Sequence, residues 1–440
     1  MSSENIKTEK TKESDIKNAR KFFQFIAASP TAFQACQTIS GCLSSAGFEE
    51  LSETSRWNLR KGGKYFIARN HSALLAFSIP ENPSFTGHFH IIASHGDSPM
   101  LKIKYEPELG MEGAYVRLNV EKYGGLLMAP WFDRPLSIAG RVIICDGKET
   151  KEVLLDFGRD LVLIPSLAIH MDREVNNGHT YKMQKELLPV FALGKPQDSF
   201  LTLLQKELGE MGLAKAEILD YDLFVYNRMA GSVWGADNEF LSAPRLDDLM
   251  CVYGSLEGFL TAEKQESICV YAMLDNEEVG SLTRQGADSG FLHDTLRRIV
   301  AGLGGDEEDF YISLAKSFLL SADNAHALHP AFPDTADPVQ RPLMNGGIVI
   351  KYHAGQKYCT DAVSGAFVRM LCKTADVPYQ VYVNHSDIAG GSTLGNISTS
   401  QAAIRAADIG LAQLAMHSCY ETAGTADLGY LSRLSKEFFR

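Results

Sequence analysis

The sequence of 440 residues has neither an excess of positive charge nor a long apolar run. Its 42 Lys and Arg residues are outnumbered by 54 Asp and Glu residues, which gives a formal net charge of −12. Proteins that bind nucleic acid generally carry a basic patch or stripe, so we expect no nucleic-acid partner. No apolar run reaches the roughly 18 residues of a membrane span, and residues 1–21 are a charged run rather than a secretory signal. We therefore expect a cytoplasmic protein that does not bind a membrane.

Several short motifs of other protein classes are also missing. The chain has no G-x-S-x-G, no G-x-x-x-x-G-K-[ST] and no H-E-x-x-H. These absences argue against a serine hydrolase, a P-loop nucleotide-binding protein and a zinc protease with two histidines on one helix. The eight cysteines are scattered and contain no C-x-x-C pair, so we expect them to be small buried residues in a reducing compartment.

The hydrophobic pattern changes twice along the chain. Up to about residue 100, and again from about residue 236, helix-like and strand-like segments alternate, as is typical of α/β domains. The stretch between them has short β segments with Gly and Pro punctuation, including the apolar run 161–170. A single βαβ connection needs only about 30 residues, so we interpret residues 101–235 as an inserted β-rich module.

The most informative stretch is Asp275-Asn276-Glu277-Glu278, which follows the apolar strand pattern of residues 267–274. In open α/β sheets, ligands bind where strands end. Two adjacent carboxylates at such a place repel each other unless a cation neutralises them. If Glu278 is a metal ligand, Glu277 is left to carry a proton. A solvated turn is the alternative interpretation of these residues alone.

A second strand pattern, residues 88–94, leads directly into His95-Gly96-Asp97. Residues two apart in an extended backbone point to the same side, so Asp97 is placed to orient the His95 imidazole as a metal ligand. An incidental H-x-D is the alternative. Later in the chain, Asp247 and Asp248 begin a helical pattern near residue 247, where either could simply cap the helix.

Further polar residues follow apolar segments in the last third of the chain. Asp323 and His326 come after one such segment, Lys351 lies on a strand pattern, and His417 follows the last apolar run. Each alone has an ordinary structural explanation. Together, however, two histidines and three carboxylates provide the ligands of a two-metal site for zinc, manganese or cobalt, namely His95, Asp247, Glu278, Asp323 and His417.

The motifs HGDSP, SAPRLDD, DNEEVGS, SADNAHALHP and LAMHS, in this order, resemble those of the aspartyl aminopeptidase family of dinuclear-zinc exopeptidases. The resemblance implies that His95 and Asp323 bind one metal, that Glu278 and His417 bind the other, and that Asp247 bridges them. It also implies that Glu277 is the general base and that Asp97 orients His95. The implied substrate contacts are His326 and Lys351, together with His170, which reaches the active site of a neighbouring subunit.

The same resemblance implies the architecture. The expected fold is α/β, with a catalytic domain of residues 1–100 and 236–440 in which a central mixed sheet is flanked by helices. Residues 101–235 would form an inserted β-rich dimerisation domain, and dimers would assemble into a tetrahedral dodecamer. A cis peptide bond is expected between Asp247 and Asp248.

The predicted function is removal of acidic residues from the free N-terminus of peptides. Two divalent cations, expected to be zinc with manganese or cobalt as alternatives, would activate a bridging water, with Glu277 as general base. A dinuclear aminopeptidase of broad or neutral specificity is one alternative. A non-catalytic, metal-stabilised oligomeric scaffold is another, but it would not need Glu277 beside Glu278 or Asp97 beside His95.

Overall fold

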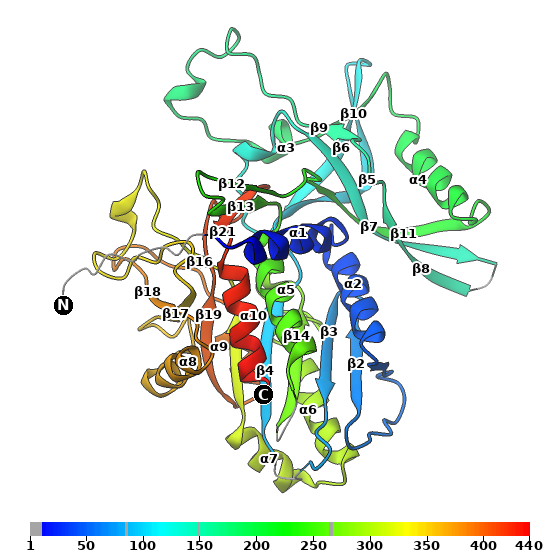
Figure 1. Ribbon diagram of the computed structural model, residues 1–440. Coiled ribbons are helices and arrows are strands. Elements are labelled where there is room, and N and C mark those ends of the chain that lie inside the picture. Colours follow the sequence, from blue (N-terminus) through cyan, green and yellow to red (C-terminus); the bar gives the residue numbers. More distant parts are fainter. Residues whose placement is uncertain (1–10, 84–86, 148, 264–266) are drawn as a thin grey trace. The chain divides into compact units, whose positions relative to one another are not determined.

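The computed structural model describes residues 11–83, 87–147, 149–263 and 267–440 (Figure 1). The chain divides into two compact units. The first consists of Met1–Asp97, Ala230–Met416 and Glu421–Arg440, and the second of Ser98–Met229 and His417–Tyr420. Among the described residues, no helix combines the length and the hydrophobicity that a membrane crossing requires.

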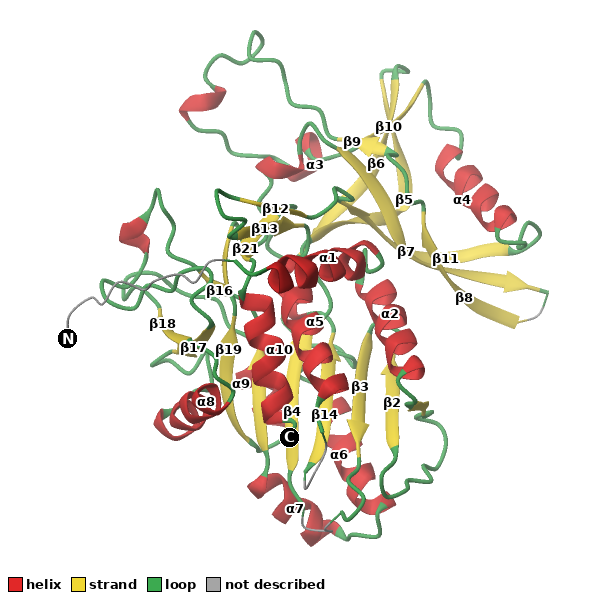
Figure 2. Ribbon diagram, in the orientation of Figure 1, coloured by secondary structure: helices red, strands yellow, loops and turns green. Residues whose placement is uncertain are grey.

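The first unit is built on a mixed sheet of nine strands, in the order β1-β2-β3-β14-β4-β15-β19-β17-β18 (Figure 2). Strands β14, β4, β15 and β19 are parallel, and their β-branched and aromatic residues are buried on both faces, as expected for parallel strands. The bounds of the strands are β1 (Glu49–Glu50), β2 (Lys64–Arg69), β3 (Ala73–Ser78), β4 (Phe89–His95), β14 (Ile268–Leu274), β15 (Phe318–Ala322), β17 (Ile348–Tyr352), β18 (Tyr379–Val383) and β19 (Arg405–Gly410).

Helices cover both faces of this sheet. Side chains alternate along β4, so that Ile92 packs into one core while Ile91 and Ala93 pack into the other. The first core is shared by α1 (Glu13–Ala27), α2 (Ala32–Ser45), α5 (Leu246–Thr261), α8 (Ala362–Thr374) and α10 (Asp427–Phe438). The second core is shared by α6 (Phe291–Gly302), α7 (Glu307–Lys316) and α9 (Leu394–Gln401).

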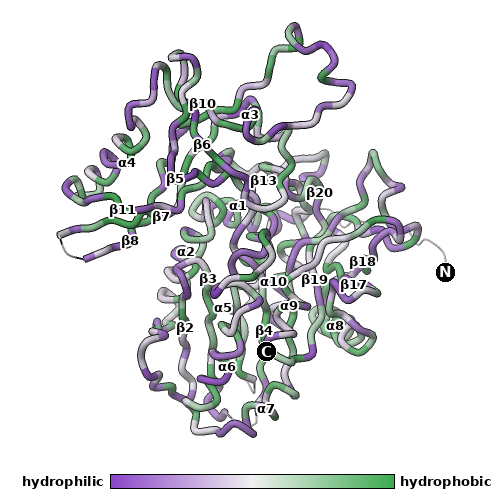
Figure 3. Tube along the Cα trace, turned by 180° about the vertical axis from the view of Figure 1, so that it is seen from behind, coloured by the Kyte–Doolittle hydropathy of each residue, from purple (hydrophilic) through white to green (hydrophobic). Residues whose placement is uncertain are grey.

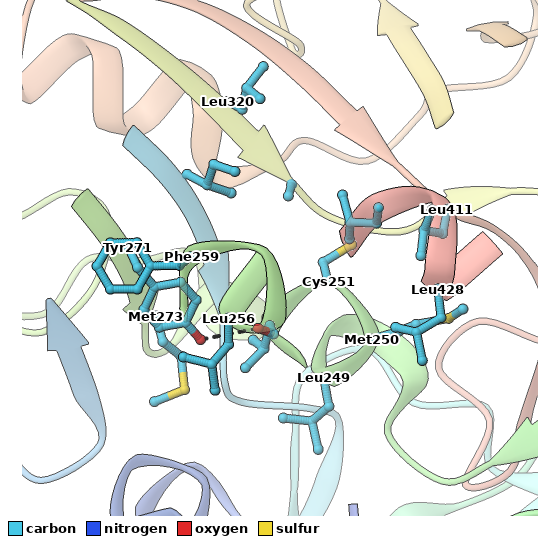
Figure 4. Packing of buried hydrophobic residues seen from close by; sticks show 14 of the residues in the cluster. Leu249, Met250, Cys251, Leu256, Phe259, Tyr271, Met273, Leu320, Leu411 and Leu428 are labelled. Carbon is cyan, nitrogen blue, oxygen red and sulfur yellow. Dashed lines mark hydrogen bonds between the residues drawn. The ribbon is translucent and has the colours of Figure 1, made fainter. Parts of the chain in front are cut away.

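Helix α5 lies deep in the first core. Its residues Leu249, Met250, Leu256 and Phe259 are almost completely buried, and Phe259 stacks on Tyr271 of β14 at a centroid distance of 5.9 Å (Figure 4). This packing fixes α5, and with it the residues at its N-terminus, against the central strands.

A second sheet of five strands, in the order β12-β13-β21-β20-β16, also belongs to the first unit. It consists of β12 (Ser232–Trp234), β13 (Phe240–Ala243), β16 (Ala325–His326), β20 (Ala412–Leu414) and β21 (Glu421–Gly424). Short 3-10 helices, η3 (Glu277–Val279) and η4 (Pro333–Thr335), complete this unit.

The second unit has a sheet of seven strands, and an additional β11–β7 pairing joins strands that are distant in the sheet order. A core that includes Trp131, Leu136 and Phe200 fills its interior. The elements are β5 (Met100–Met111), β6 (Tyr115–Tyr123), β7 (Pro135–Asp146), β8 (Glu149–Asp156), β9 (Val162–Leu163), β10 (Val190–Leu193), β11 (Glu217–Tyr226), α3 (Met183–Glu186), α4 (Ser199–Glu210), η1 (Ala129–Trp131) and η2 (Val175–Asn177).

The predicted fold class, an α/β protein with a central mixed sheet flanked by helices and a further β-rich region, is confirmed. The predicted strand at residues 161–170 is largely wrong, since only Val162–Leu163 are in a strand and residues 165–170 are exposed. Pro165 lacks a backbone N–H for the ladder, and without a partner strand the apolar side chains that follow do not form one. The hydropathy of each segment can be followed in Figure 3.

Candidate metal centre and catalytic site

Three neighbouring parallel strands end at the same edge of the nine-stranded sheet. Leu274, the last residue of β14, pairs with His95, the last residue of β4. On the other side of β4, Ser321 of β15 pairs with Ala93, so Asp323 comes two residues later at the level of His95. The register therefore brings the DNEE turn, His95 and Asp323 to one place, although more than 200 residues separate the first and the last of them along the chain.

The His95 imidazole faces carboxylates on both sides. Its Nε2 lies 3.4 Å from Asp247 Oδ1 and 3.8 Å from Asp323 Oδ1. Its Nδ1 lies 3.4 Å from Asp97 Oδ1 and 3.1 Å from the Asp97 backbone oxygen. A carbonyl oxygen only accepts, so Nδ1 carries a proton and the Asp97 side holds the ring in place.

The spacing of these atoms suits a bound cation. Ligand atoms held tetrahedrally by zinc at about 2.0–2.1 Å lie roughly 3.3 Å from one another. The side-chain donor atoms of His95, Asp247 and Asp323 lie within 4.8 Å of one another, and those of His95, Glu277 and Glu278 form a second such group. Carboxylate oxygens and imidazole nitrogen are ligands that zinc, manganese and cobalt all accept, so the residues fit a divalent metal.

Asp97 also shapes the turn that carries the paired glutamates. Its Oδ1 accepts a hydrogen bond from Glu277 N and its Oδ2 one from Glu278 N, both at 3.1 Å. The turn starts at Asn276 with a φ of 60° and ends at Gly280 with a φ of 99°, the left-handed region that suits these residue types. One buried aspartate thus contacts the His95 ring and the backbone of both glutamates.

Burial and like charges shift the acids of this site. Burial, together with the nearby Asp323 and Asp97 carboxylates, raises the pKa of Glu277 to about 8. Burial and the Asp247 carboxylate raise the pKa of Glu278 well above its usual range. Burial by itself also raises the pKa of Asp323, but the Lys351 ammonium and the His95 imidazole outweigh it and lower that pKa to about 2.

Asp247 lies in a distorted first turn of α5. Arg245 precedes the helix with a φ of 58°, and Asp247 and Asp248 have backbone angles that are not helical. The peptide bond between Asp247 and Asp248 is cis, as predicted. Asp248 is completely buried, and its Oδ2 accepts a hydrogen bond from His95 N at 3.3 Å, so both aspartates contact His95.

The two substrate contacts predicted in the first unit have different environments. Lys351 is 2% exposed, donates a hydrogen bond to the Asn324 backbone oxygen at 2.7 Å and lies 3.6 Å from Asp323 Oδ2. His326, on β16, is exposed, and its ring lies 6.0 Å from that of Tyr382. Lys351 is therefore a buried ammonium rather than the surface lysine that a strand-edge position alone would suggest.

Two predicted residues belong to the second unit. The His417 ring donates through Nδ1 to the Gly125 backbone oxygen at 2.8 Å, so the neutral imidazole carries its lone pair on Nε2, the form that a metal ligand needs. His170 is exposed in the loop after β9. Their roles as metal ligand and substrate contact stay predictions.

Sequence reasoning missed three buried residues around Asp247. For Asp248 the sequence suggests only a helix cap, and not its hydrogen bond with the His95 backbone. Asn324 and Glu421 are 3% and 1% exposed, and each hydrogen-bonds the backbone next to or at Asp247. Asn324 directly follows the predicted ligand Asp323, and this position is the feature of the sequence that could have indicated a role at the site. Nothing in the sequence distinguishes Glu421 from the other 53 acidic residues.

Comparison with known proteins gives a consistent result. A family model described as "Aminopeptidase I zinc metalloprotease (M18)" matches residues 25–439. The "Probable M18 family aminopeptidase 2" of Clostridium acetobutylicum is 44% identical over 436 residues, covering 97% of this chain and 99% of the relative. The protein of the same name from Stutzerimonas stutzeri is 40% identical over 418 residues, covering 94% of this chain and 96% of that protein.

Solved structures are similar as well. A chain of the Ape4 and Nbr1 complex superimposes with a TM-score of 0.93 at 33% identity, covering 98% of this chain and 87% of that one. The structure described as "Structure of S. cerevesiae mApe1 dodecamer" gives a TM-score of 0.83 at 28% identity and covers 97% of each chain.

Proposed function

Because the chain belongs to the aminopeptidase I zinc metalloprotease family (M18) and is a metalloaminopeptidase, we propose that it removes Asp and Glu from the N-terminus of peptides. The observation that carries this proposal is the position of Lys351. A buried ammonium 3.6 Å from Asp323 is a cation beside the group of candidate metal ligands, where an acidic substrate side chain would need one.

We propose two divalent cations in the site, with zinc as the expected metal and manganese or cobalt as alternatives. His95 and Asp323 would hold one, Glu278 and His417 the other, and Asp247 both. When bound, such ions polarise a substrate carbonyl and lower the pKa of water from about 15.7 towards 7. The surplus carboxylate charge of the site would attract the amino group of a peptide N-terminus, which accounts for cleavage at chain ends.

Glu277 is the proposed general base. Its backbone is fixed by Asp97, and its carboxylate is a group that can accept a proton from water beside the candidate metal ligands. Glu277 would take a proton from the attacking water and return it to the leaving amine. Asp97 would orient both the His95 ring and the turn that carries Glu277.

We also propose a homo-oligomer, a dodecamer built from dimers, in the cytoplasm. The inserted β-rich domain, which we place at residues 101–235, would form the dimer contact. His170 would reach the active site of a neighbouring subunit. The dodecamer of the similar mApe1 structure supports this assembly. The eight cysteines, all of which lie among the described residues, are free thiols.

A broad or neutral specificity is the second candidate. It is favoured by the fact that Lys351 already contacts Asn324 and Asp323 within the chain. In that case the ammonium offsets the charge of Asp323 and does not recognise substrate.

Cleavage of Asp-, Glu-, Leu- and Ala-linked amides tests the proposal. Each amide is assayed with the purified protein, after chelation, and after adding back zinc, manganese or cobalt. We expect the Asp and Glu amides to be cleaved fastest, activity to vanish on chelation and metal to restore it. Equal rates on all four amides would support the neutral specificity, and cleavage that survives chelation would overturn the metal-dependent mechanism.

A further inference from the structure

The backbone on both sides of the Asp247 nitrogen is held by buried side chains that are not themselves candidate ligands. Asn324 Nδ2 donates to the Leu246 backbone oxygen at 2.9 Å. Glu421 Oε2 accepts from Asp247 N at 3.0 Å. Neither contact involves the Asp247 carboxylate, so both fix where that carboxylate points without competing with a metal for it.

A glutamine joins these two contacts into one chain of hydrogen bonds. Asn324 Nδ2 donates to Gln413 Oε1 at 2.9 Å, and Gln413 Nε2 donates to Glu421 Oε1 at 3.5 Å. Gln413 and Glu421 are each 1% exposed. They lie on β20 and β21, the paired strands of the five-stranded sheet, and Glu421 pairs in turn with Ala243 of β13. The small sheet is thus the frame that carries this chain of contacts.

Only one assignment of donors and acceptors satisfies every hydrogen bond of this chain of contacts. Its two ends are fixed, because the Leu246 carbonyl only accepts and the Asp247 N–H only donates. Asn324 must therefore turn Nδ2 towards Leu246 and Gln413, and Gln413 must turn Nε2 towards residue 421. Residue 421 then has to accept at both of its side-chain atoms, which a carboxylate does and an amide cannot.

The same network reaches the buried lysine. The Asn324 backbone oxygen accepts from Lys351 Nζ at 2.7 Å, while the Asn324 side chain holds Leu246. Cys251 of α5 donates to Asn324 Oδ1 at 3.3 Å, which uses the remaining side-chain atom of Asn324. One residue therefore links the backbone of a candidate metal ligand to the proposed substrate-binding cation.

We propose that Glu421, acting through Gln413 and Asn324, is a positioning residue that sets the Asp247 carboxylate for metal binding. The inference rests on the proposed role of Asp247 as a ligand. The negative charge of Glu421 lets both of its oxygens accept hydrogen bonds near that ligand. Glu421 itself neither binds the metal nor transfers a proton.

Zinc affinity, measured by competition with a chromophoric chelator, is the test, with Glu421→Gln as the main variant. In that variant two groups of the same kind, either two N–H donors or two oxygen acceptors, must face each other at some point of the network, whichever amides flip. We expect zinc affinity to fall about 10- to 100-fold, the usual range when a residue that supports a metal ligand is lost. Unchanged zinc affinity would overturn the proposal.

The double variant Glu421→Gln with Gln413→Glu is the rescue. It exchanges the carboxylate and the amide, keeps the net charge and allows each hydrogen bond named above. We expect it to recover zinc affinity to within a few-fold of the unaltered protein. A folded double variant that binds zinc as weakly as Glu421→Gln would show that the arrangement of donors and acceptors does not cause the loss of zinc affinity. If Glu421→Gln does not fold, Gln413→Met breaks the same link, and its zinc affinity is expected to fall in the same way.

Two further variants show whether an effect is specific to Glu421 and whether Asp247 is a metal ligand. Asp427 is completely buried and accepts from Asn345 N at 2.6 Å and Gly347 N at 3.0 Å, so Asp427→Asn removes a similar carboxylate away from Asp247. We expect it to lower the melting temperature of the metal-free protein and to leave zinc affinity unchanged. Asp247→Asn should itself weaken zinc binding. If it does not, the ligand assignment of the proposed function fails, independently of Glu421.

Discussion

The two units of this protein surround their carboxylates differently, as half-buried Asp222 and the acids of the candidate site show. In the second unit, Asp222 lies 2.7 Å from Lys102 Nζ and 2.9 Å from Arg141 Nε. Burial raises the pKa of Asp222, but the two basic side chains outweigh burial and lower it below its usual range. At Glu277 and Glu278 of the first unit, by contrast, burial dominates, and it raises the pKa of Glu277 to about 8 and that of Glu278 well above its usual range.

The difference shows at which site the protein does not neutralise its own negative charge, so that protons or a metal ion must do so. Around Asp222 the protein supplies its own cations, so the carboxylate is ionised and the site is complete. At the edge of the nine-stranded sheet, Lys351 and protonated His95 offset only part of the charge of Asp247, Asp323 and the two glutamates. Buried acids in that position either take up protons or bind a metal, and the family is one of zinc enzymes.

The largest effect expected is on catalysis, from Glu277→Gln. The amide cannot accept a proton, while Asp97 still holds the backbone N–H of residue 277. We expect kcat on an Asp amide to fall by about 10²- to 10⁴-fold, the usual contribution of a general base. Zinc content should stay unchanged, as measured by metal analysis of the purified variant.

The matched control for Glu277→Gln is Glu152→Gln in the second unit. Glu152 pairs with Arg141 at 3.1 Å and has no proposed catalytic role, so its kcat should match that of the unaltered protein. If Glu277→Gln kept its kcat, the proton carrier would have to be another group.

Removal of metal should have the next largest effect, on stability and its pH dependence. A carboxyl group with a pKa of about 8 in the folded chain and about 4.5 in the unfolded chain binds more protons when folded. Glu277 therefore contributes stability to the metal-free protein at low pH, and this contribution is lost as pH rises from about 4.5 to about 8. Zinc at 100 times its Kd adds about 2.7 kcal/mol to the free energy of unfolding.

Melting temperatures at several pH values, with chelator and with zinc, measure this effect. We expect zinc to raise the melting temperature most near pH 8, where the metal-free site has lost the protons that neutralised it. Protonation of His95 acts against zinc at low pH, because burial lowers its pKa but the Asp247, Asp323 and Asp97 carboxylates raise it well above the usual value. A zinc effect that does not depend on pH would contradict this account.

The fold and most of the site could be predicted because their signals are local. Apolar β-branched runs predict the central strands. The polar residues directly after those runs, namely His95, Asp323 and the Glu277–Glu278 pair, are predicted to lie at the site. Parallel strands end at one edge, so residues at their ends come together whatever their separation along the chain. The structure brings these residues together in the first unit, and their roles as ligands and base stay predictions.

The supporting residues could not be predicted because their signals are not local. Glu421 acts through a hydrogen bond to Asp247, 174 residues earlier in the chain, and Gln413 joins it to Asn324. An isolated Gln or Glu in a short strand looks like any other polar residue. The five-stranded sheet itself was missed, since its strands are only two to four residues long and carry no periodicity.

A smaller effect is expected on specificity, from Lys351→Met, which keeps the volume of the side chain and removes its charge. A hydrogen bond to a charged group contributes about 1.5–3 kcal/mol, so we expect the preference for Asp over Leu amides to fall about 10- to 100-fold. The ratio of kcat/KM values on the two amides measures it. Lys357→Met, which removes another lysine of the first unit, one that donates to the Gly390 oxygen, is the control and should keep the preference.

An equal loss of kcat/KM on both amides in Lys351→Met would change the interpretation. It would mean that the ammonium acts on Asp323, 3.6 Å away, and not on the substrate side chain. The specificity would then be broad, and Lys351 would play for Asp323 the part that Lys102 plays for Asp222 in the second unit.

The smallest effect is expected from Asp222→Asn, which tests the other side of the comparison. Its side chain is 31% exposed, and Arg141 keeps its ion pair with Glu152, so we expect a loss of about 1 kcal/mol in the free energy of unfolding. The loss should be the same with zinc and with chelator, and zinc affinity and kcat should not change. Melting curves in both conditions measure it. If the Asp222→Asn loss depended on zinc, the charge of the second unit would be coupled to the metal, and the contrast between a self-balanced carboxylate and a metal-dependent one would not hold.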